Sequence, residues 1–150
     1  MRYQQRPYSC GATAIVNALR ALGRRITERS AITLANTSPA LGTSSEGILG
    51  AFRALGYDAS SVDLKLRKDA WAWVTRNLNV GKPIILCVDD WQHWVTAIGM
   101  VGDRVILVDS TNTKINKSEN GIWVLSKREF MTKWRHSRKG VYSGIVIGRK

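Results

Sequence analysis

Hydrophobic and polar residues follow two different periods along the chain, and the change comes near Pro83. Before Pro83, apolar residues mostly recur every three or four positions, which is the period of an amphipathic helix. After Pro83 they form short continuous or alternating runs, which is the pattern of β-strands. The pattern predicts helices at 10–22, 28–35 and 68–79, two more after the segments 43–46 and 126–129, and strands at 57–63, 84–88, 94–101, 104–108, 122–125 and 141–147.

Short polar residues and glycines mark the ends of these helices. Ser9 is placed to cap the first helix and Gly23 to end it, and Thr27 precedes the second helix. The segments Thr43–Glu46 and Ser126–Glu129 have the Ser/Thr-x-x-Glu spacing of a capping box. Because most of the later strands are joined by connections too short for a parallel crossover, the sequence predicts an α+β fold with helices packed on an antiparallel β-sheet.

The length and composition are those of a globular protein, so we expect residues 1–150 to form a single domain. No apolar run approaches the ~20 residues of a membrane helix, and the N-terminus lacks the apolar region of an export signal. Cys10 and Cys87 are too few for a disulfide scaffold. We therefore expect two reduced thiols, no membrane partner and a cytoplasmic location, or a virion or host cytoplasm if a phage encodes the chain.

The charge balance is strongly basic, with 23 Lys and Arg against 11 Asp and Glu and a formal net charge of +12. A solvated basic surface is the simplest interpretation, and attraction to an acidic partner, a nucleic acid or a virion interior is the alternative. No RNP-like aromatic motif, zinc-finger spacing or helix-turn-helix pattern accompanies these charges. Charge alone therefore does not predict a nucleic-acid-binding protein.

Cys10 falls in the first turn of the first predicted helix. Unpaired N–H groups and the positive end of the helix dipole favour an anion there, which lowers the pKa of a thiol. Cys10 is therefore a candidate nucleophile, although a lone cysteine is more often a small buried hydrophobic residue. Cys87 lies in the apolar run IILCV and is predicted to be a core residue.

A cysteine nucleophile needs a base and a group that orients the base. Of the two histidines, His93 at the start of a predicted strand is better placed than His136, which lies in a basic segment predicted to be exposed. Asp109 ends the next strand, sixteen residues after His93. Because the two strands form a hairpin around residues 102–103, we expect His93 and Asp109 at the same open end.

Two glutamines precede the cysteine and are candidates for stabilising an oxyanion. The side-chain amide of Gln4, six residues before Cys10, is placed to donate a hydrogen bond together with the backbone N–H of Cys10. Gln5 is the alternative donor.

The residues around His93 have other candidate roles. Asp89 and Asp90 lie close to it in sequence and raise the idea of a metal site. The chain offers no second histidine with ligand spacing, so we expect no metal and no cofactor. Trp94 is predicted to shield the His–Asp pair rather than to contact substrate, and Trp91 fits either a structural or a substrate-contacting role.

The order and spacing of these residues resemble those of papain-like cysteine peptidases. The matching residues are Gln4, Cys10-Gly11, His93-Trp94-Val95 and Val108-Asp109. The chain resembles the C39 family in particular, the bacteriocin-processing peptidase domains and their standalone relatives, over nearly its whole length. The likeness also includes GTSSEGILGAFRALGY, KPIIL and a final helix with Lys127-Arg128-Glu129-Phe130 and Trp134.

This resemblance implies a papain-like peptidase fold and a role for each candidate residue. The nucleophile would be Cys10, the general base and acid His93, the orienting residue Asp109 and the oxyanion donor Gln4. Candidate substrate-binding residues are Gly11, Trp91 and Trp94. Ser9 and Ser110 stand where the family often has an acidic residue and a proline, and neither departure removes a catalytic group.

The sequence therefore predicts a cysteine peptidase that cleaves a peptide or protein substrate by acyl transfer through a Cys-His-Asp triad. One alternative keeps the site but changes the acceptor, giving a thiol amidase, acyltransferase or isopeptidase. The other is a non-catalytic basic binding protein that docks a nucleic acid or a virion.

Overall fold

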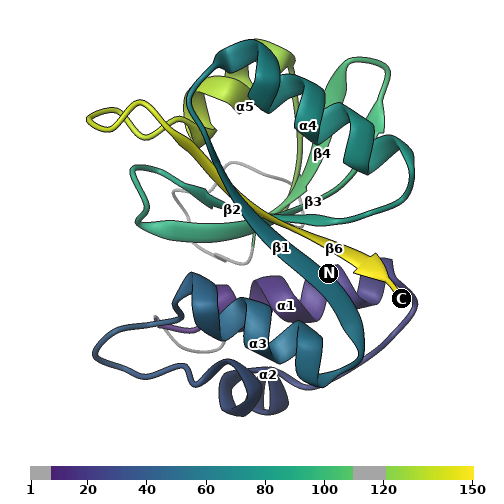
Figure 1. Cartoon of the computed structure of the whole chain (residues 1–150), viewed down its shortest axis with the longest axis vertical. Coiled ribbons are helices and arrows are strands. Elements are labelled where there is room, and N and C mark those ends of the chain that lie inside the picture. Colours follow the sequence, from purple (N-terminus) through teal and green to yellow (C-terminus); the bar gives the residue numbers. More distant parts are fainter. Residues whose placement is uncertain (1–7, 110–120) are drawn as a thin grey trace.

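The computed structural model describes residues 8–109 and 121–150, and this part of the chain contains five helices and six strands (Figure 1). The helices are α1 (Cys10–Ala21), α2 (Glu28–Ala35), α3 (Ser45–Ala54), α4 (Arg67–Asn79) and α5 (Lys127–Trp134). The strands are β1 (Tyr57–Leu64), β2 (Ile84–Val88), β3 (His93–Val101), β4 (Arg104–Val108), β5 (Ile122–Leu125) and β6 (Tyr142–Arg149). Within the described residues, none of the helices has the length and apolar character needed to cross a membrane.

The six strands form one antiparallel sheet in the order β1-β6-β2-β3-β4-β5. The predicted α+β architecture with an antiparallel sheet is therefore confirmed. Strand β6, which follows the other five in the chain, lies between β1 and β2 and pairs with both. The two neighbours β3 and β4 form the predicted hairpin, in which Thr96 is opposite Val108 and Val101 is opposite Arg104.

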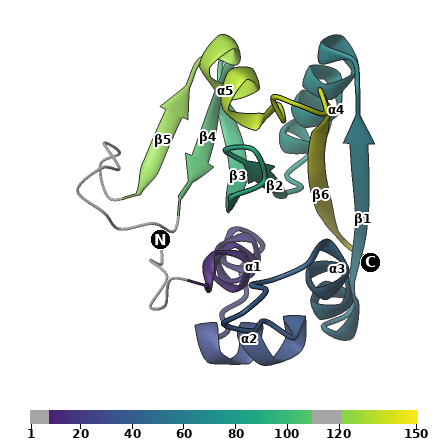
Figure 2. The same cartoon turned by 90° about the vertical axis from the view of Figure 1, so that its left-hand side faces the viewer.

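Helices cover both faces of this sheet (Figures 1 and 2). Helices α1, α2 and α3 pack with Ile85 and Ile145 on one face, and α4 and α5 pack with Ile84 and Leu86 on the other. Because successive residues of a strand point to opposite faces, a strand between two helical layers must be apolar throughout. All five residues of β2 are accordingly buried.

The helix caps agree with the sequence at one predicted capping box and differ at the other. The Ser126 hydroxyl accepts from the Glu129 N–H, and the Glu129 carboxylate accepts from the Ser126 N–H, which is the predicted reciprocal pair. In α3 the cap is Ser44, which accepts from the Gly47 N–H, so the predicted box at Thr43–Glu46 is wrong by one residue. The Thr43 hydroxyl is instead hydrogen bonded to the Thr37 hydroxyl at 2.6 Å.

Two glycines in α3 give a matched test of the packing between α2 and α3. A Cβ on Gly47 would lie 2.2 Å from the carbonyl oxygen of Ala35, whereas a Cβ on Gly50 would have no neighbour within 4 Å. We expect Gly47→Ala to lower the free energy of unfolding by about 1–3 kcal/mol, because backbone must move to admit the methyl group. Gly50→Ala should raise it by about 0.5–1 kcal/mol through helix propensity.

Chemical denaturation of both variants measures this difference directly. Equal effects of the two substitutions would contradict the close approach of α3 to the end of α2.

Candidate active site

Cys10 is the first residue of α1, a helix that is buried from Gly11 to Leu19. Ser9 occupies the predicted N-cap position, but its side chain makes no capping hydrogen bond to α1, contrary to the prediction. The Ser9 hydroxyl donates to the Glu28 carboxylate at 3.0 Å, and the Thr13 hydroxyl donates to the same oxygen at 2.8 Å. These bonds join the start of α1 to the start of α2. The first turn of α1 contains no acidic residue, so its dipole favours an anion at Cys10.

His93 and Asp109 meet at the open end of the β3–β4 hairpin, as the sequence predicts. His93 begins β3 and Asp109 directly follows β4. The imidazole Nε2 lies 2.7 Å from Asp109 Oδ1, and the two side chains are 15% and 8% exposed. A short contact in a largely dry setting is a strong one, because little water competes for either partner.

The thiol of Cys10 reaches the same imidazole from the face of the sheet that carries α1. A hydrogen bond joins Cys10 to the His93 side chain, and the backbone N–H of Trp94 also contacts the sulfur. Because Nε2 faces Asp109, the thiol is served by the other ring nitrogen, Nδ1. Helix α1 is fixed against β3 by the buried Thr96 hydroxyl, which donates to the Ala14 carbonyl at 2.9 Å.

These contacts shift the pKa values of the pair toward a thiolate and an imidazolium. Burial raises the pKa of the Cys10 thiol, but hydrogen bonds from His93, Trp94 and Gly11 and the charge of His93 outweigh it, so the net pKa falls below its usual value of 9.0. Burial lowers the pKa of His93, but hydrogen bonds to Asp109 and Cys10 and their charges raise it to about 9. The thiolate and the imidazolium therefore coexist between the lowered pKa of Cys10 and the His93 pKa of about 9, which gives a nucleophile and a proton donor together.

Trp94 and Gly11 pack together beside the thiol. The indole Nε1 of Trp94 donates to the Thr43 carbonyl at 3.0 Å. A Cβ on Gly11 would lie 2.6 Å from the Thr43 Cβ and 3.1 Å from the Trp94 ring, so this helix position requires glycine. A cavity of about 330 Å³ opens next to Trp94. Its lining includes Thr43, Ser44, Cys87, Trp91 and Trp94.

Cys87 is buried in β2 on the face that carries α1, and the prediction of a core residue is confirmed. Burial, with a smaller contribution from the charge of Cys10, raises the pKa of the Cys87 thiol to about 12. Both cysteines are free thiols. The two thiols therefore differ strongly in expected reactivity.

The remaining predicted residues fall in different places. Gln4 and Gln5 lie outside the described residues. Trp91 lies in the turn before His93 and lines the cavity. The prediction of an exposed His136 is wrong, because its side chain is buried beneath Trp91 with ring centroids 4.5 Å apart. Across residues 8–109 and 121–150, no group of three or more His, Cys, Asp or Glu is arranged to hold a metal ion.

Sequence reasoning missed two residues that support the site. Glu28 receives the hydroxyls at the start of α1, and Thr43 supports Trp94 through its carbonyl. Both contacts connect residues far apart in the chain, and neither follows from a local period. Glu28 was recognisable only as an acidic residue in the first turn of α2.

The sequence matches a known family model over most of its length. The model described as the Peptidase C39 family matches residues 1–137. The chain is also 29% identical over 119 residues to the lactococcin-G-processing and transport ATP-binding protein LagD of Lactococcus lactis subsp. lactis. The match covers 77% of this chain and only 16% of that relative.

Solved structures share the fold at low sequence identity. The peptidase domain of Streptococcus ComA, described as a bifunctional ABC transporter in a quorum-sensing pathway, superposes with a TM-score of 0.75 at 18% identity, covering 99% of this chain and 97% of that one. A double glycine motif protease from an AMS/PCAT transporter, solved in complex with the leader peptide, gives 0.72 at 15% identity, covering 99% and 89%.

Proposed function

The chain belongs to the peptidase C39 family of cysteine peptidases, and from this premise we propose that it hydrolyses a peptide substrate with Cys10 as nucleophile, His93 as general base and acid, and Asp109 as orienting residue. The observation that carries the assignment is the continuous contact from the Cys10 thiol through the His93 imidazole to the Asp109 carboxylate. Each contact is the one that the proposed role needs: proton transfer at Nδ1 and orientation at Nε2.

In the first half of the reaction, the Cys10 thiolate attacks the carbonyl carbon of the scissile peptide bond. Negative charge collects on the carbonyl oxygen, where the backbone N–H of Cys10 and the Gln4 amide are the proposed donors. The tetrahedral intermediate collapses as the imidazolium of His93 donates its proton to the leaving amine. An acyl group is then bound to the sulfur and the imidazole is neutral.

In the second half, neutral His93 accepts a proton from water as the water attacks the thioester. The acid product leaves, the sulfur departs as thiolate, and the imidazolium is restored. Asp109 keeps the imidazole in one orientation through both steps and stabilises its charged form. The cycle returns to the starting ion pair without an added cofactor.

For the substrate, we propose a peptide with two glycines before the scissile bond. The support is the leader peptide described for the double glycine motif protease of the same fold. Next to the thiol, Gly11 packs so closely against Thr43 and Trp94 that a Cβ has no room there, and we propose that a substrate residue without Cβ approaches this crowded position most easily.

The proposal predicts selective alkylation of one cysteine. Cys10 should react with iodoacetamide well below its usual pKa of 9.0, whereas Cys87, with a pKa of about 12, should not react over the same range. His93→Ala should slow Cys10 alkylation at neutral pH, because the hydrogen bond and charge that lower the thiol pKa are removed while burial remains. Mass spectrometry of the two cysteine peptides across pH measures both rates, and Cys87 is the internal control.

Two outcomes separate the alternatives. Slow Cys10 alkylation that is unaffected by His93→Ala would contradict the catalytic assignment. Fast alkylation without peptide hydrolysis would favour the amidase, acyltransferase or isopeptidase alternative. The alternative of a basic binding protein rests on the net charge of +12.

A further inference from the structure

The turn that precedes His93 has an unusual backbone. Asp89, Asp90 and Trp91 all have positive φ angles, of 53°, 55° and 67°. The left-handed region is costly for residues with a Cβ, is tolerated best by Asp and Asn among them, and is rare for a bulky residue such as tryptophan. Three such residues in succession persist only where neighbouring contacts hold them.

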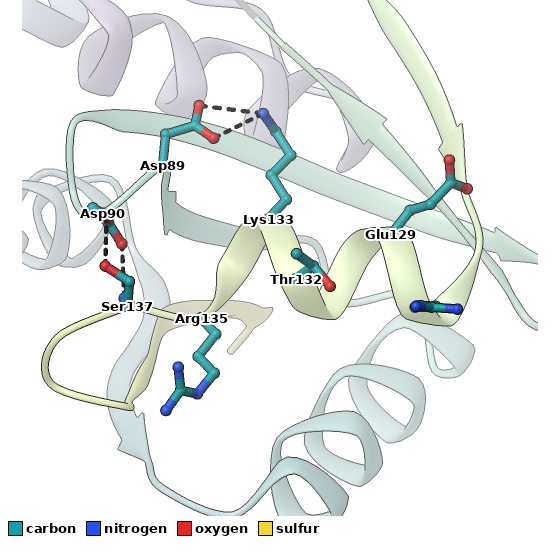
Figure 3. A pocket seen from close by; sticks show the side chains of 8 residues that line it. Asp89, Asp90, Glu129, Thr132, Lys133, Arg135 and Ser137 are labelled. Carbon is teal, nitrogen blue, oxygen red and sulfur yellow. Dashed lines mark hydrogen bonds and ion pairs between the residues drawn. The ribbon is translucent and has the colours of Figure 1, made fainter.

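One segment, Lys133–Lys139, supplies a contact to each residue of the turn. Figure 3 shows the contacts to Asp89 and Asp90. Asp89 donates its N–H to the Lys133 carbonyl at 3.2 Å, and its carboxylate pairs with the Lys133 ammonium at 3.2 Å. Asp90 accepts from Ser137 at both carboxylate oxygens: the backbone N–H bonds at 2.7 Å and the hydroxyl at 2.8 Å. Trp91 has His136 against its ring and the Lys139 ammonium 4.7 Å from the ring centroid.

The end of the Lys133–Lys139 segment and the two residues after it are joined by their own hydrogen bonds. His136 donates its N–H to the Val141 carbonyl at 2.9 Å and accepts the Gly140 N–H at its own carbonyl at 2.8 Å. Its ring Nδ1 accepts the Lys139 N–H at 3.1 Å. Gly140 supplies the one positive φ angle of this tight turn, 62°. The segment therefore presents its groups to the Asp89–Trp91 turn in a preformed arrangement.

Among these contacts, the pair of bonds between Asp90 and Ser137 is the one to test. The Asp89–Lys133 ion pair is exposed to solvent, where such pairs contribute little. Trp91 lines the cavity near the thiol, so its replacement would also change the cavity wall. Asp90 and Ser137 do not line that cavity. Their two bonds are also exposed to solvent, but they are short, engage both oxygens of one carboxylate and hold the pKa of the Asp90 carboxyl below its usual value.

We propose that Asp90 and Ser137 are positioning residues, which hold the left-handed turn and thereby fix the His93 imidazole between Cys10 and Asp109. The inference rests on the proposed function, because it concerns the geometry of the same imidazole. The link along the chain is short. Gln92 donates its N–H to the Asp89 carbonyl, and the next residue, His93, begins β3 opposite Val88, the last residue of β2. Pairing with β2 fixes the position of the His93 backbone. We infer that the backbone conformation of the preceding turn sets the orientation of the His93 ring.

The experiment compares Asp90→Gly with Asp90→Asn. Glycine adopts the left-handed conformation freely but accepts no bond from Ser137, so Asp90→Gly should lower kcat for peptide hydrolysis about tenfold or more, with KM within about twofold. Asparagine tolerates the same backbone and keeps a carbonyl oxygen for the Ser137 N–H, so kcat of Asp90→Asn should stay within about 1.5-fold of wild type. Asp103→Gly, in the turn at the other end of β3, is the matched control and should behave as wild type.

A second readout reports the imidazole itself. Iodoacetate is an anion that the imidazolium attracts, whereas iodoacetamide is neutral, so the ratio of their rates at Cys10 falls as His93 loses its proton. In wild type this fall should be centred near pH 9. In Asp90→Gly the midpoint of this fall should move toward pH 6.5, the ordinary pKa of histidine, because a displaced ring loses its bonds to Asp109 and Cys10. A merely structural role would lower thermal stability without moving this midpoint.

The outcomes are distinguishable from failure of the proposed function. If the wild-type ratio changes near pH 9 and Asp90→Gly keeps both that midpoint and its kcat, the positioning role is wrong while the catalytic pair stands. If the ratio of the iodoacetate and iodoacetamide rates is the same in wild type and His93→Ala, Cys10 and His93 do not form the proposed pair, and the proposed function itself is wrong. Ser137→Ala, which loses only the hydroxyl bond, gives a milder variant in case Asp90→Gly does not fold, with an expected loss of about threefold in kcat and the same direction of pH shift.

Discussion

Cys10→Ala is expected to abolish peptide hydrolysis while leaving the fold intact. Covalent catalysis has no substitute for its nucleophile, so kcat/KM should fall by a factor on the order of 10⁴ or more. The free energy of unfolding should change by no more than about 1 kcal/mol, because Cys10 begins a helix and is only partly buried. Mass spectrometry of a leader-like peptide with two glycines at the cleavage site, incubated with each variant, measures the loss.

Two controls make this experiment decisive. Cys87→Ala replaces the same residue type in the core and should keep hydrolysis within about threefold, although cavity formation lowers its thermal stability. A matched peptide in which alanines replace the two glycines tests the proposed substrate preference. Full hydrolysis by a folded Cys10→Ala protein would refute the nucleophile assignment.

His93→Ala is the second substitution with a large expected effect, and it should act in two ways. Loss of the general base and acid should reduce kcat by about 10²–10⁴. The variant also leaves the Asp109 carboxylate, which is buried, without its 2.7 Å contact to the imidazole, so the protein should be less stable by about 1–3 kcal/mol. Steady-state kinetics and chemical denaturation measure the two effects separately.

Asp109→Asn provides the graded comparison for His93→Ala. The asparagine carbonyl still accepts from Nε2 and orients the ring, but the negative charge that helps to raise the His93 pKa is gone. The alkaline limb of the pH profile of kcat/KM should therefore move from about pH 9 to lower pH, with a smaller loss at neutral pH than His93→Ala causes. An unchanged alkaline limb would contradict the role of the carboxylate charge.

Local patterns predicted most of the secondary structure because each element carries its own signal. The IILCV run of β2 is apolar throughout since both faces of that strand are covered, and the Ser126–Glu129 box forms as its spacing requires. The Thr43–Glu46 box failed because two adjacent serines follow the threonine and the second residue of the segment, Ser44, takes the cap. A motif of common residues leaves the register open by one position.

The site was predictable in unequal parts. His93 and Asp109 follow from the hairpin, because counting outward from the turn brings both to one end. That Cys10 reaches His93 depends on how α1 crosses β3, which no local pattern contains, and it came from the family resemblance. The left-handed turn before His93 contains no glycine, so the usual sequence signal for positive φ was missing.

His136 shows why a basic segment was misread. Its neighbours Arg135, Arg138 and Lys139 are charged, and local composition therefore indicated an exposed loop. The ring is buried because Trp91 from a distant turn covers it. Burial of a polar ring beneath a partner 45 positions away in the sequence is a tertiary property.

The place of β6 in the sheet has a consequence for protein synthesis. The strand made last among the six lies in the interior of the sheet, between β1 and β2. A chain emerging from the ribosome can form α1 and the β3–β4 hairpin early, but it cannot close the sheet until residues 142–149 have been translated. The nascent chain therefore carries the three proposed catalytic side chains before the sheet is complete, and we expect peptidase activity only after the last strand has been translated.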